Sequence, residues 1–251
     1  YFIKKNIPLI FTTLESAELA KYASNAFLAM KISYINEIAL LSEKLDANVS
    51  DIARIMGLDS RIGEDFLKAG LGFGGSCFPK DTLSFLNIAK DNGSDLGIVD
   101  AAVKTNEYMK EYLLSKIISK SGDIKGKEIA VLGLSFKPGT DDIRESPSIG
   151  LIRRIVSAGG HVRVYCPKAM ENSKKVMEDI KDFITFTENE YECAKNADLI
   201  ILATEWEQFR ELDFTKIRNS MCSNYFFDLR NMFIHSENVK KLFKYYPVGI
   251  N

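Results

Sequence analysis

The run KEIAVLGLSF, Lys127–Phe136, divides this chain into two kinds of sequence. Before it, long stretches without Gly or Pro predict helices. After it, short apolar runs alternate with short helical patterns, which is typical of a parallel, doubly wound sheet. We therefore expect a two-domain fold of α+β type, with an all-helical domain over residues 1–122 and a Rossmann-like α/β domain over residues 123–251. Gly, Ser and Lys cluster at this boundary.

The α/β domain is predicted from further β-rich runs and the helical patterns between them. The strands expected after the first are HVRVYCP, FITFTEN, LIILATE and YFFDLRN, and the helices are residues 148–158, YECAKNA and residues 215–219. Strands that alternate with helices at this short spacing favour a parallel sheet.

The helical domain is predicted to be built on one long central helix. The stretch TTLE, Thr12–Glu15, fits a capping box, and no Gly or Pro follows it until well past residue 40. Apolar residues surround most of this helix, which predicts a buried helix at a subunit interface and hence a homodimerisation domain. The other helices expected are VSDIARIMG, DTLSFLNIAKDNG and IVDAAVKTNEYMKEYLLSKIISKSG.

Composition excludes several classes of protein. The formal net charge is −1, which gives no field that would attract nucleic acid or an acidic membrane surface. No apolar run is long enough to span a bilayer and no signal peptide is visible, so we expect no membrane association. The four cysteines are far apart and there are only 2 histidines, which predicts no metal site and reduced thiols in a cytoplasmic protein. The first residues, YFIKKNIPLIFTT, lack an initiator Met and suggest a fragment or processed form.

Two polar residues on the long helix are candidates for a functional role. Lys21 and Asn25 are four residues apart, so both project from one face of an otherwise Ala- and Phe-rich helix. A buried charge needs a partner, but a lysine that reaches solvent beside a satisfied asparagine fits the sequence as well. We expect Asn36 and Glu37, further along the helix, to serve helix packing.

The second candidate is the glycine-rich stretch FLKAGLGFGGSCFPKD, Phe66–Asp81. Its Gly70, Gly72 and Gly75 match G-x-G-x-x-G, but a helical region precedes them, so we reject a dinucleotide-binding fingerprint. Such glycines would instead let the backbone approach a ligand closely. Cys77 is either a nucleophile, activated by Lys80 and by a helix beginning near Asp81, or a structural thiol, and the residues alone leave both open.

Several motifs resemble those of the UDP-glucose/GDP-mannose dehydrogenase family, in the right order. The helix SAELAKYASNAFLAMKISYINEIA, the segment GLDSRIGEDFLKAGLGFGGSCFPKD, and the stretches LGLSFKPGTDDIRESPS and FFDLRN carry the resemblance. Members have an N-terminal NAD-binding domain, a helical dimerisation domain and a C-terminal UDP-binding domain. The resemblance covers only the last two, which implies that this chain lacks the NAD-binding domain and is inactive alone. One departure is YCP, with Cys166 where the family has Asp; we interpret this thiol as structural.

The resemblance implies a two-step oxidation of the sugar C6 alcohol to a carboxylate, with NAD as the cofactor. Cys77 matches the nucleophile that captures the intermediate aldehyde. Lys21 and Asn25 match the pair that stabilises the oxyanion, and Asp81 matches the residue that positions the hydrolytic water. Cys77, Lys80 and Arg144 match residues that contact NAD.

The same resemblance implies a set of substrate contacts. Arg61 matches an arginine that reaches the substrate of a neighbouring subunit. The other expected contacts are Phe66, Lys68, Ala69, Gly70, Leu71, Gly72, Phe73, Gly74, Phe136, Lys137 and Arg230. UDP-glucose is the expected substrate, with UDP-N-acetylmannosamine and GDP-mannose as alternatives. A non-catalytic module for dimerisation and nucleotide-sugar binding is a further alternative.

Overall fold

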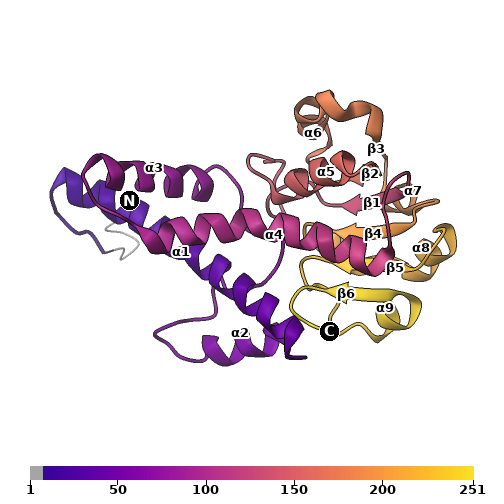
Figure 1. Ribbon diagram of the computed structural model, residues 1–251, viewed down its shortest axis with the longest axis horizontal. Helices are drawn as coiled ribbons and strands as arrows, with labels where there is room; N and C mark the ends of the chain where they lie inside the picture. The colour runs from indigo at the N-terminus through magenta and orange to yellow at the C-terminus, as the bar shows by residue number, and fades with distance from the viewer. Residues whose placement is uncertain (1–7) are drawn as a thin grey trace.

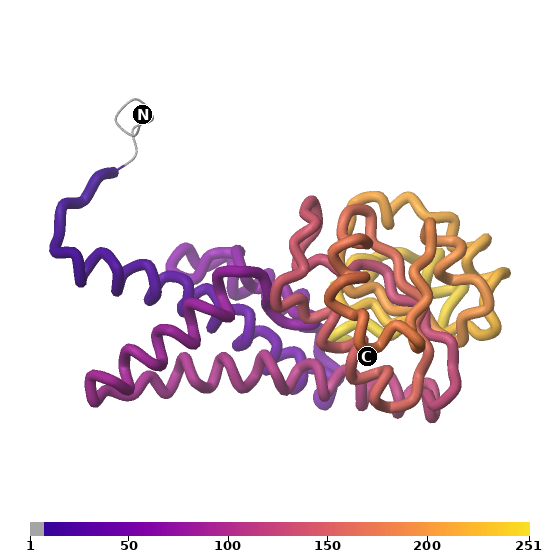
Figure 2. Tube along the Cα trace, turned by 90° about the horizontal axis from the view of Figure 1, so that it is seen from above, coloured from indigo at the N-terminus to yellow at the C-terminus, as the bar shows by residue number. Residues whose placement is uncertain are grey.

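The computed structural model describes residues 8–251 and consists of a helical part followed by a helix-covered sheet (Figure 1). The four helices of the helical part are α1 (Leu14–Lys44), α2 (Val49–Gly57), α3 (Phe78–Asp91) and α4 (Gly97–Ser121). α1 has 31 residues, which corresponds to a length of about 46 Å. Figure 2 shows α1, α3 and α4 extending together away from the sheet, and α1 packs on both other helices.

The start of α1 corrects the expected capping box. The N-cap is Thr13, whose hydroxyl accepts a hydrogen bond from the backbone N–H of Ser16 at 3.2 Å. The prediction placed the box one residue earlier, with Glu15 as the reciprocal partner. Glu15 lies instead in the first turn, where its charge complements the positive end of the helix dipole.

The expectation that α1 is buried nearly all round is wrong within this chain. Its inner face is buried, for example at Ala29 and Ile35. Phe27, Tyr34 and Leu41, which are seven residues apart, remain 58%, 47% and 51% exposed. An apolar residue every two turns gives a continuous apolar strip along one side of the helix.

The α/β part confirms the expected Rossmann-like fold. Its six strands are all parallel and follow the order β3-β2-β1-β4-β5-β6, which is the order of a doubly wound sheet. The strands are β1 (Glu128–Leu132), β2 (His161–Tyr165), β3 (Ile184–Phe186), β4 (Leu199–Leu202), β5 (Tyr225–Asp228) and β6 (Lys244–Pro247). β6 has no counterpart among the predicted strands.

Helices connect the strands on both faces of the sheet. They are α5 (Pro147–Ser157), α6 (Met170–Val176), α7 (Glu190–Ala194), α8 (Phe214–Ser220) and α9 (Glu237–Leu242), with 3₁₀ turns at Glu178–Phe183 and Glu207–Glu211. α5 packs against α4, while α7 packs on α8 and α8 on α9. The sequence predicted α5, α7 and α8 but not α6 or α9.

The helical part and the sheet share one continuous hydrophobic core. It runs from Ile35 and Ala39 on α1 through Leu113 on α4 to the strands of the sheet. The helices end at Ser121 and the first strand begins at Glu128, but the division into domains at residue 122 stays a prediction.

A buried polar cluster joins α1, α4 and the C-terminal end of the chain. The Glu43 carboxylate accepts hydrogen bonds from Lys116 Nζ at 2.6 Å, from the Tyr112 hydroxyl at 2.5 Å and from the backbone N–H of Gly249 at 2.8 Å. Lys116 Nζ also donates to the Pro247 carbonyl. The C-terminus therefore lies at the junction between the sheet and the helical part (Figure 1).

Candidate active site

Three of the four predicted catalytic side chains meet between α1 and α3. Lys21 Nζ lies 2.9 Å from Asp81 Oδ2, and Asn25 Nδ2 donates to the same oxygen at 2.6 Å. The Asp81 side chain is fully buried, whereas the Lys21 side chain is 54% exposed. The spacing of four residues places both donors on one face of α1, as expected from the sequence. Their shared contact with Asp81 was not predicted.

The two charges of this cluster stabilise each other. Burial would raise the pKa of Asp81, but the hydrogen bonds from Lys21 and Asn25 outweigh it and hold this pKa below its usual value. The hydrogen bond to Asp81 raises the pKa of Lys21, with smaller contributions from Tyr22 and Cys77. Both groups are therefore charged at neutral pH.

The second carboxylate oxygen of Asp81 has no hydrogen-bond partner among residues 8–251. The nearest cation is Lys80 Nζ at 3.8 Å, which is too far for a hydrogen bond. Asp81 Oδ1 is therefore a buried acceptor that makes no hydrogen bond with residues 8–251.

Cys77 is the N-cap residue of α3 and is exposed. α3 begins at Phe78, three residues before the predicted start, because Pro79 is compatible with the first turn of a helix. The Phe78 ring lies against two aromatic rings of the preceding segment, 5.9 Å from Phe66 and 6.1 Å from Phe73 between centroids. These contacts fix the helix end that presents the thiol.

The glycine-rich segment before Cys77 follows helix α2 and not a strand, which confirms that it is no dinucleotide fingerprint. Its residues Ala69–Gly75 are buried. A Cβ at Gly70 would lie 2.7 Å from the Leu229 carbonyl, and one at Gly75 would lie 2.8 Å from the Phe136 ring. The α/β part therefore leaves no room for side chains here. The sequence analysis expected these glycines to allow a close approach to a ligand. In the structure they allow a close approach to other parts of the protein.

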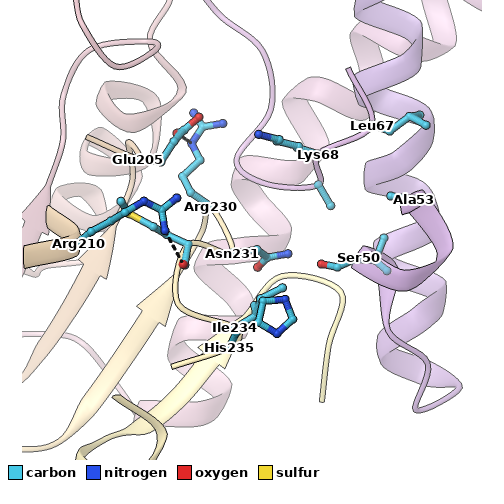
Figure 3. A pocket seen from close by; sticks show the side chains of 13 residues that line it. Ser50, Ala53, Leu67, Lys68, Glu205, Arg210, Arg230, Asn231, Ile234 and His235 are labelled. Carbon is cyan, nitrogen blue, oxygen red and sulfur yellow. Dashed lines mark hydrogen bonds and ion pairs between the residues drawn. The ribbon is translucent and has the colours of Figure 1, made fainter. Parts of the chain in front are cut away.

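A cleft of about 480 Å³ lies between α2, residues 67–69 and the loops that follow β4 and β5 (Figure 3). Of the predicted substrate residues, Lys68, Ala69 and Arg230 line it. The other lining residues are Val49, Ser50, Ala53, Leu67, Glu205, Arg210, Asn231, Met232, Ile234 and His235. In parallel α/β sheets such clefts at the carboxyl ends of strands are the usual ligand sites.

Arg230 is held firmly at the edge of this cleft. Its Nε donates to the Ala203 carbonyl at 2.8 Å and lies 3.3 Å from Glu205 Oε2 (Figure 3). Its buried Nη2 has no hydrogen-bond partner among the described residues. An arginine with one spare buried donor at a cleft is suited to bind an anionic oxygen.

The loop that carries Arg230 is fixed by its neighbours. Asp228, at the end of β5, accepts hydrogen bonds from the backbone N–H groups of Arg230 and Phe233 and from the Tyr245 hydroxyl. Burial raises the pKa of Asp228. Asn231 donates to and accepts from the backbone of Val248, at 2.8 Å in each case.

The other predicted site residues lie outside this cleft. Arg61 is 87% exposed and paired with Asp59, and Lys137 is exposed above the ring of Phe136. The remaining members of the predicted set also lie elsewhere: Lys21, Asn25, Phe66, Gly70, Leu71, Gly72, Phe73, Gly74, Cys77, Lys80, Asp81, Phe136 and Arg144.

Two predicted cofactor residues have exposed cationic side chains. Lys80 is 71% exposed, and Arg144, 68% exposed, pairs through two nitrogens with Asp142. The backbone carbonyl of Arg144 accepts a hydrogen bond from Gly75 N–H at 2.8 Å, so this arginine lies beside the glycine-rich segment.

Sequence reasoning missed five polar residues of the cleft: Ser50 on α2, and Glu205, Arg210, Asn231 and His235. Glu205 and Arg210 follow β4, and Asn231 and His235 follow β5. The rule that ligands bind beyond the carboxyl ends of parallel strands could have found these last four.

All four cysteines are free thiols, and Cys166 is buried, with its backbone N–H directed at Met170 Sδ. Within residues 8–251 no helix combines the length and apolarity needed to cross a bilayer. The same residues contain no cluster of three or more potential metal ligands.

Comparison with known proteins connects both parts of the chain to one family. Residues 15–108 match the central domain of the UDP-glucose/GDP-mannose dehydrogenase family, and residues 130–235 match its UDP binding domain. A UDP-glucose 6-dehydrogenase of Rhizobium meliloti (strain 1021) is 47% identical over 243 residues, which are 96% of this chain and 55% of that protein.

Solved structures show the same fold. A UDP-glucose dehydrogenase from Pyrobaculum islandicum has a TM-score of 0.89 and 35% identity, covering 100% of this chain and 55% of its own. A UDP-D-ManNAc dehydrogenase from Pyrococcus horikoshii has a TM-score of 0.81 and 28% identity, with coverage of 97% and 54%. The chain thus spans about half the length of these relatives. It belongs to the UDP-glucose/GDP-mannose dehydrogenase family, of which it carries the central and UDP-binding domains.

Proposed function

We propose that this chain is the cysteine- and substrate-bearing part of an NAD-dependent UDP-glucose 6-dehydrogenase, which oxidises UDP-glucose to UDP-glucuronate. The observation that carries the proposal is the cluster of Lys21, Asn25 and Asp81 beside the helix that begins after Cys77. A thiol, an amine, an amide and a carboxylate at one place are the groups that covalent aldehyde oxidation needs.

Each group has one chemical role in this proposal. The first oxidation converts the C6 alcohol to an aldehyde. Cys77 Sγ then bonds to the aldehyde carbon, and Lys21 and Asn25 donate hydrogen bonds to the oxygen that gains charge. Loss of a second hydride leaves a thioester, which water cleaves to the acid and the free thiol. Asp81 Oδ1, which has no hydrogen-bond partner among the described residues, accepts a hydrogen bond from that water.

NAD, when bound, supplies the hydride acceptor for both oxidations. Lys80 and Arg144 are exposed cations close to Asp81 and to the glycine-rich segment, and they fit contacts to its phosphates. The remaining contacts of a dinucleotide need a phosphate-binding turn after a strand. β1, the first strand of the described residues, is followed by GLSFKPG, which lacks that pattern. We therefore propose that the 251-residue chain is inactive by itself.

The cleft beside Arg230 supports a nucleotide sugar as the substrate. Arg230, Lys68 and Arg210 bring positive charge to the carboxyl ends of β4 and β5, which suits a diphosphate. The relative named as a UDP-glucose 6-dehydrogenase is 47% identical, whereas the one named as a UDP-D-ManNAc dehydrogenase is 28% identical. This difference favours glucose as the sugar over N-acetylmannosamine.

Binding of UDP-glucose to the 251-residue chain tests this proposal. Arg230→Ala is expected to raise the dissociation constant for UDP-glucose, measured by calorimetry, by about ten- to a hundredfold, because a charged donor to the diphosphate is lost. Arg153→Ala removes an arginine paired with Asp179 away from the cleft and is the matched control. A wild-type chain that binds GDP-mannose more tightly than UDP-glucose, or an Arg230→Ala variant that binds normally, would contradict the assignment.

We also propose that two copies associate through α1. The strip of Phe27, Tyr34 and Leu41 is an apolar helix face that a second α1 could cover by twofold symmetry. The exposed Arg61 could then reach the site of the partner subunit, as the family resemblance implies.

The wild-type chain is therefore expected to sediment as a dimer at micromolar concentration. Phe27→Glu should shift it to a monomer, because a charge cannot be buried in the interface without a partner. Phe183→Glu, at a 44% exposed phenylalanine of the α/β part, is the control and should leave the dimer intact. A wild-type monomer would disprove the association.

The alternative of a non-catalytic module shares these binding properties and differs only in turnover.

A catalytic thiol has to stay reduced, which supports the cytoplasm as the location of the enzyme.

A further inference from the structure

Asn106 on α4 makes two hydrogen bonds to the main chain of the glycine-rich segment. Its Oδ1 accepts a hydrogen bond from the Phe73 N–H at 2.7 Å, and its Nδ2 donates to the Phe73 carbonyl at 3.1 Å. Both side chains are 5% exposed. The amide of Asn106 therefore acts as a peptide group that pairs with Phe73, in a segment that has no neighbouring strand to satisfy it.

The contact between Asn106 and the main chain requires glycine at position 72. The φ of Gly72, +108°, lies in the region that favours glycine, and a Cβ at this position would collide with Asn106 Oδ1. The two hydrogen bonds require one acceptor and one donor on the same short side chain. Aspartate has the acceptor but, when ionised, lacks the donor.

A second buried asparagine holds the start of the same segment. Asn36 on α1, which the sequence assigned to helix packing, is fully buried and accepts a hydrogen bond from Gly70 N–H at 2.8 Å. Gly75 N–H is bound in turn by the Arg144 carbonyl of the α/β part. The segment between Lys68 in the cleft and Cys77 is thus fixed at both ends and in its middle.

The helices that supply the asparagines are also joined to each other by two further hydrogen bonds. Ser33 on α1 donates to the Ala102 carbonyl on α4 at 2.6 Å, and the Thr105 hydroxyl donates to Glu37 at 2.6 Å. These bonds hold α1 and α4 together without touching the segment. They allow the stability of the helix pair to be separated from the positioning of the segment.

We propose that Asn106, with Asn36, is a positioning residue that sets the backbone of residues 70–75 for the nucleotide sugar. The proposal rests on the proposed function, since it concerns the same substrate. Preorganisation is the physical reason: a segment already held in its bound shape loses less entropy when the ligand binds. Lys68 and Cys77 lie at the two ends of the segment, so its placement affects both the cleft and the thiol.

The test compares three variants of the 251-residue chain. Asn106→Ala and Asn106→Asp are expected to weaken UDP-glucose binding at pH 8 by about ten- to a hundredfold. Thr105→Val removes the adjacent, partly buried hydrogen bond between the same helices and should leave the dissociation constant within about twofold of wild type. All three should lower the melting temperature, so a loss of stability alone does not separate them.

The pH dependence of UDP-glucose binding by Asn106→Asp distinguishes a positioning role from a purely structural one. Burial raises the pKa of an introduced carboxyl group, and its neutral form offers one donor and one acceptor, as the amide does. Binding by Asn106→Asp should therefore recover toward the wild-type value as the pH falls from 8 to 5. Asn106→Ala should not recover.

The possible outcomes are distinct. If both Asn106 variants bind UDP-glucose as tightly as Thr105→Val at every pH, Asn106 is only a packing residue and the proposal is wrong. If Asn106→Asp stays as weak at pH 5 as at pH 8, the paired donor and acceptor are not the reason for the loss. A wild-type chain that does not bind UDP-glucose at all would instead reject the proposed function.

Discussion

Replacing Cys77 by serine in the whole protein to which this chain belongs should lower UDP-glucuronate formation by roughly a thousandfold or more. Binding of UDP-glucose should change by less than about twofold, because the thiol contacts the sugar only at its reacting carbon. The rate is measured as acid product per unit time, and binding is measured by calorimetry.

The reason for this large effect is the second oxidation. An aldehyde cannot lose a hydride until a nucleophile has added to its carbon. Sulfur adds readily and then leaves from the thioester, whereas a serine hydroxyl without a neighbouring base is a poor nucleophile. Cys77 is exposed at the start of α3, so its thiol is accessible to a substrate.

Two controls make the Cys77 result specific. Cys222→Ser changes the other exposed cysteine, which lies in the α/β part and donates to the Asn196 carbonyl, and it should retain full activity. The 251-residue chain alone, given NAD and UDP-glucose, should form no NADH. Normal acid production by Cys77→Ser, or turnover by the chain alone, would contradict this assignment of roles.

Removing the carboxylate of Glu43 should produce the largest loss of stability. Glu43→Ala is expected to lower the free energy of unfolding by about 3–5 kcal/mol, since it leaves a buried ammonium group without its partner. The side chains of Lys116 and Glu43 are 7% and 9% exposed. The Tyr112 hydroxyl and the Gly249 N–H would lose their acceptor in the same step.

The pH dependence of this variant has a defined sign. Burial lowers the pKa of Lys116, and Glu43 offsets part of that effect. Without Glu43 the folded protein binds the proton of Lys116 less tightly than the unfolded chain does, so stability should rise with pH. The loss in the free energy of unfolding caused by Glu43→Ala should therefore become smaller as the pH is raised toward 10, where the lysine becomes neutral.

Denaturant unfolding measures these changes. The double variant Glu43→Ala, Lys116→Met should recover much of the stability, because no unpaired charge remains. Glu178→Ala removes a 66% exposed carboxylate from a pair with Lys181, which is itself 61% exposed, and is expected to cost less than about 1 kcal/mol. An equally small effect of Glu43→Ala would show that the cluster does not join α1 to the C-terminal strand.

The sequence predicted most of the fold because its periodic patterns are local. The end of α2 at Gly57 and the parallel sheet followed from apolar spacing and turn residues. β6 was not predicted because its sequence, KYYP, is short and combines a charge with a proline. The predicted helix began at Asp81 and so lacked the first turn of α3, which contains Pro79.

The candidate site was predictable where spacing along one helix decides the geometry. Lys21 and Asn25 share one face of α1 for that reason, whereas their contact with Asp81 on α3 was not predicted. The roles of Asn36 and Asn106 were not visible, because their partners are backbone groups of a distant segment. No pattern within a single helix records such a contact.

The most direct test of the account is to trap the covalent intermediate. The whole protein is mixed with UDP-glucose and NAD, quenched with acid during turnover and digested for mass spectrometry. The account predicts a UDP-sugar acyl group on the peptide that carries Cys77, absent without NAD and absent in Cys77→Ser. Sustained UDP-glucuronate production with no adduct on Cys77, or an adduct on a different residue, would contradict it.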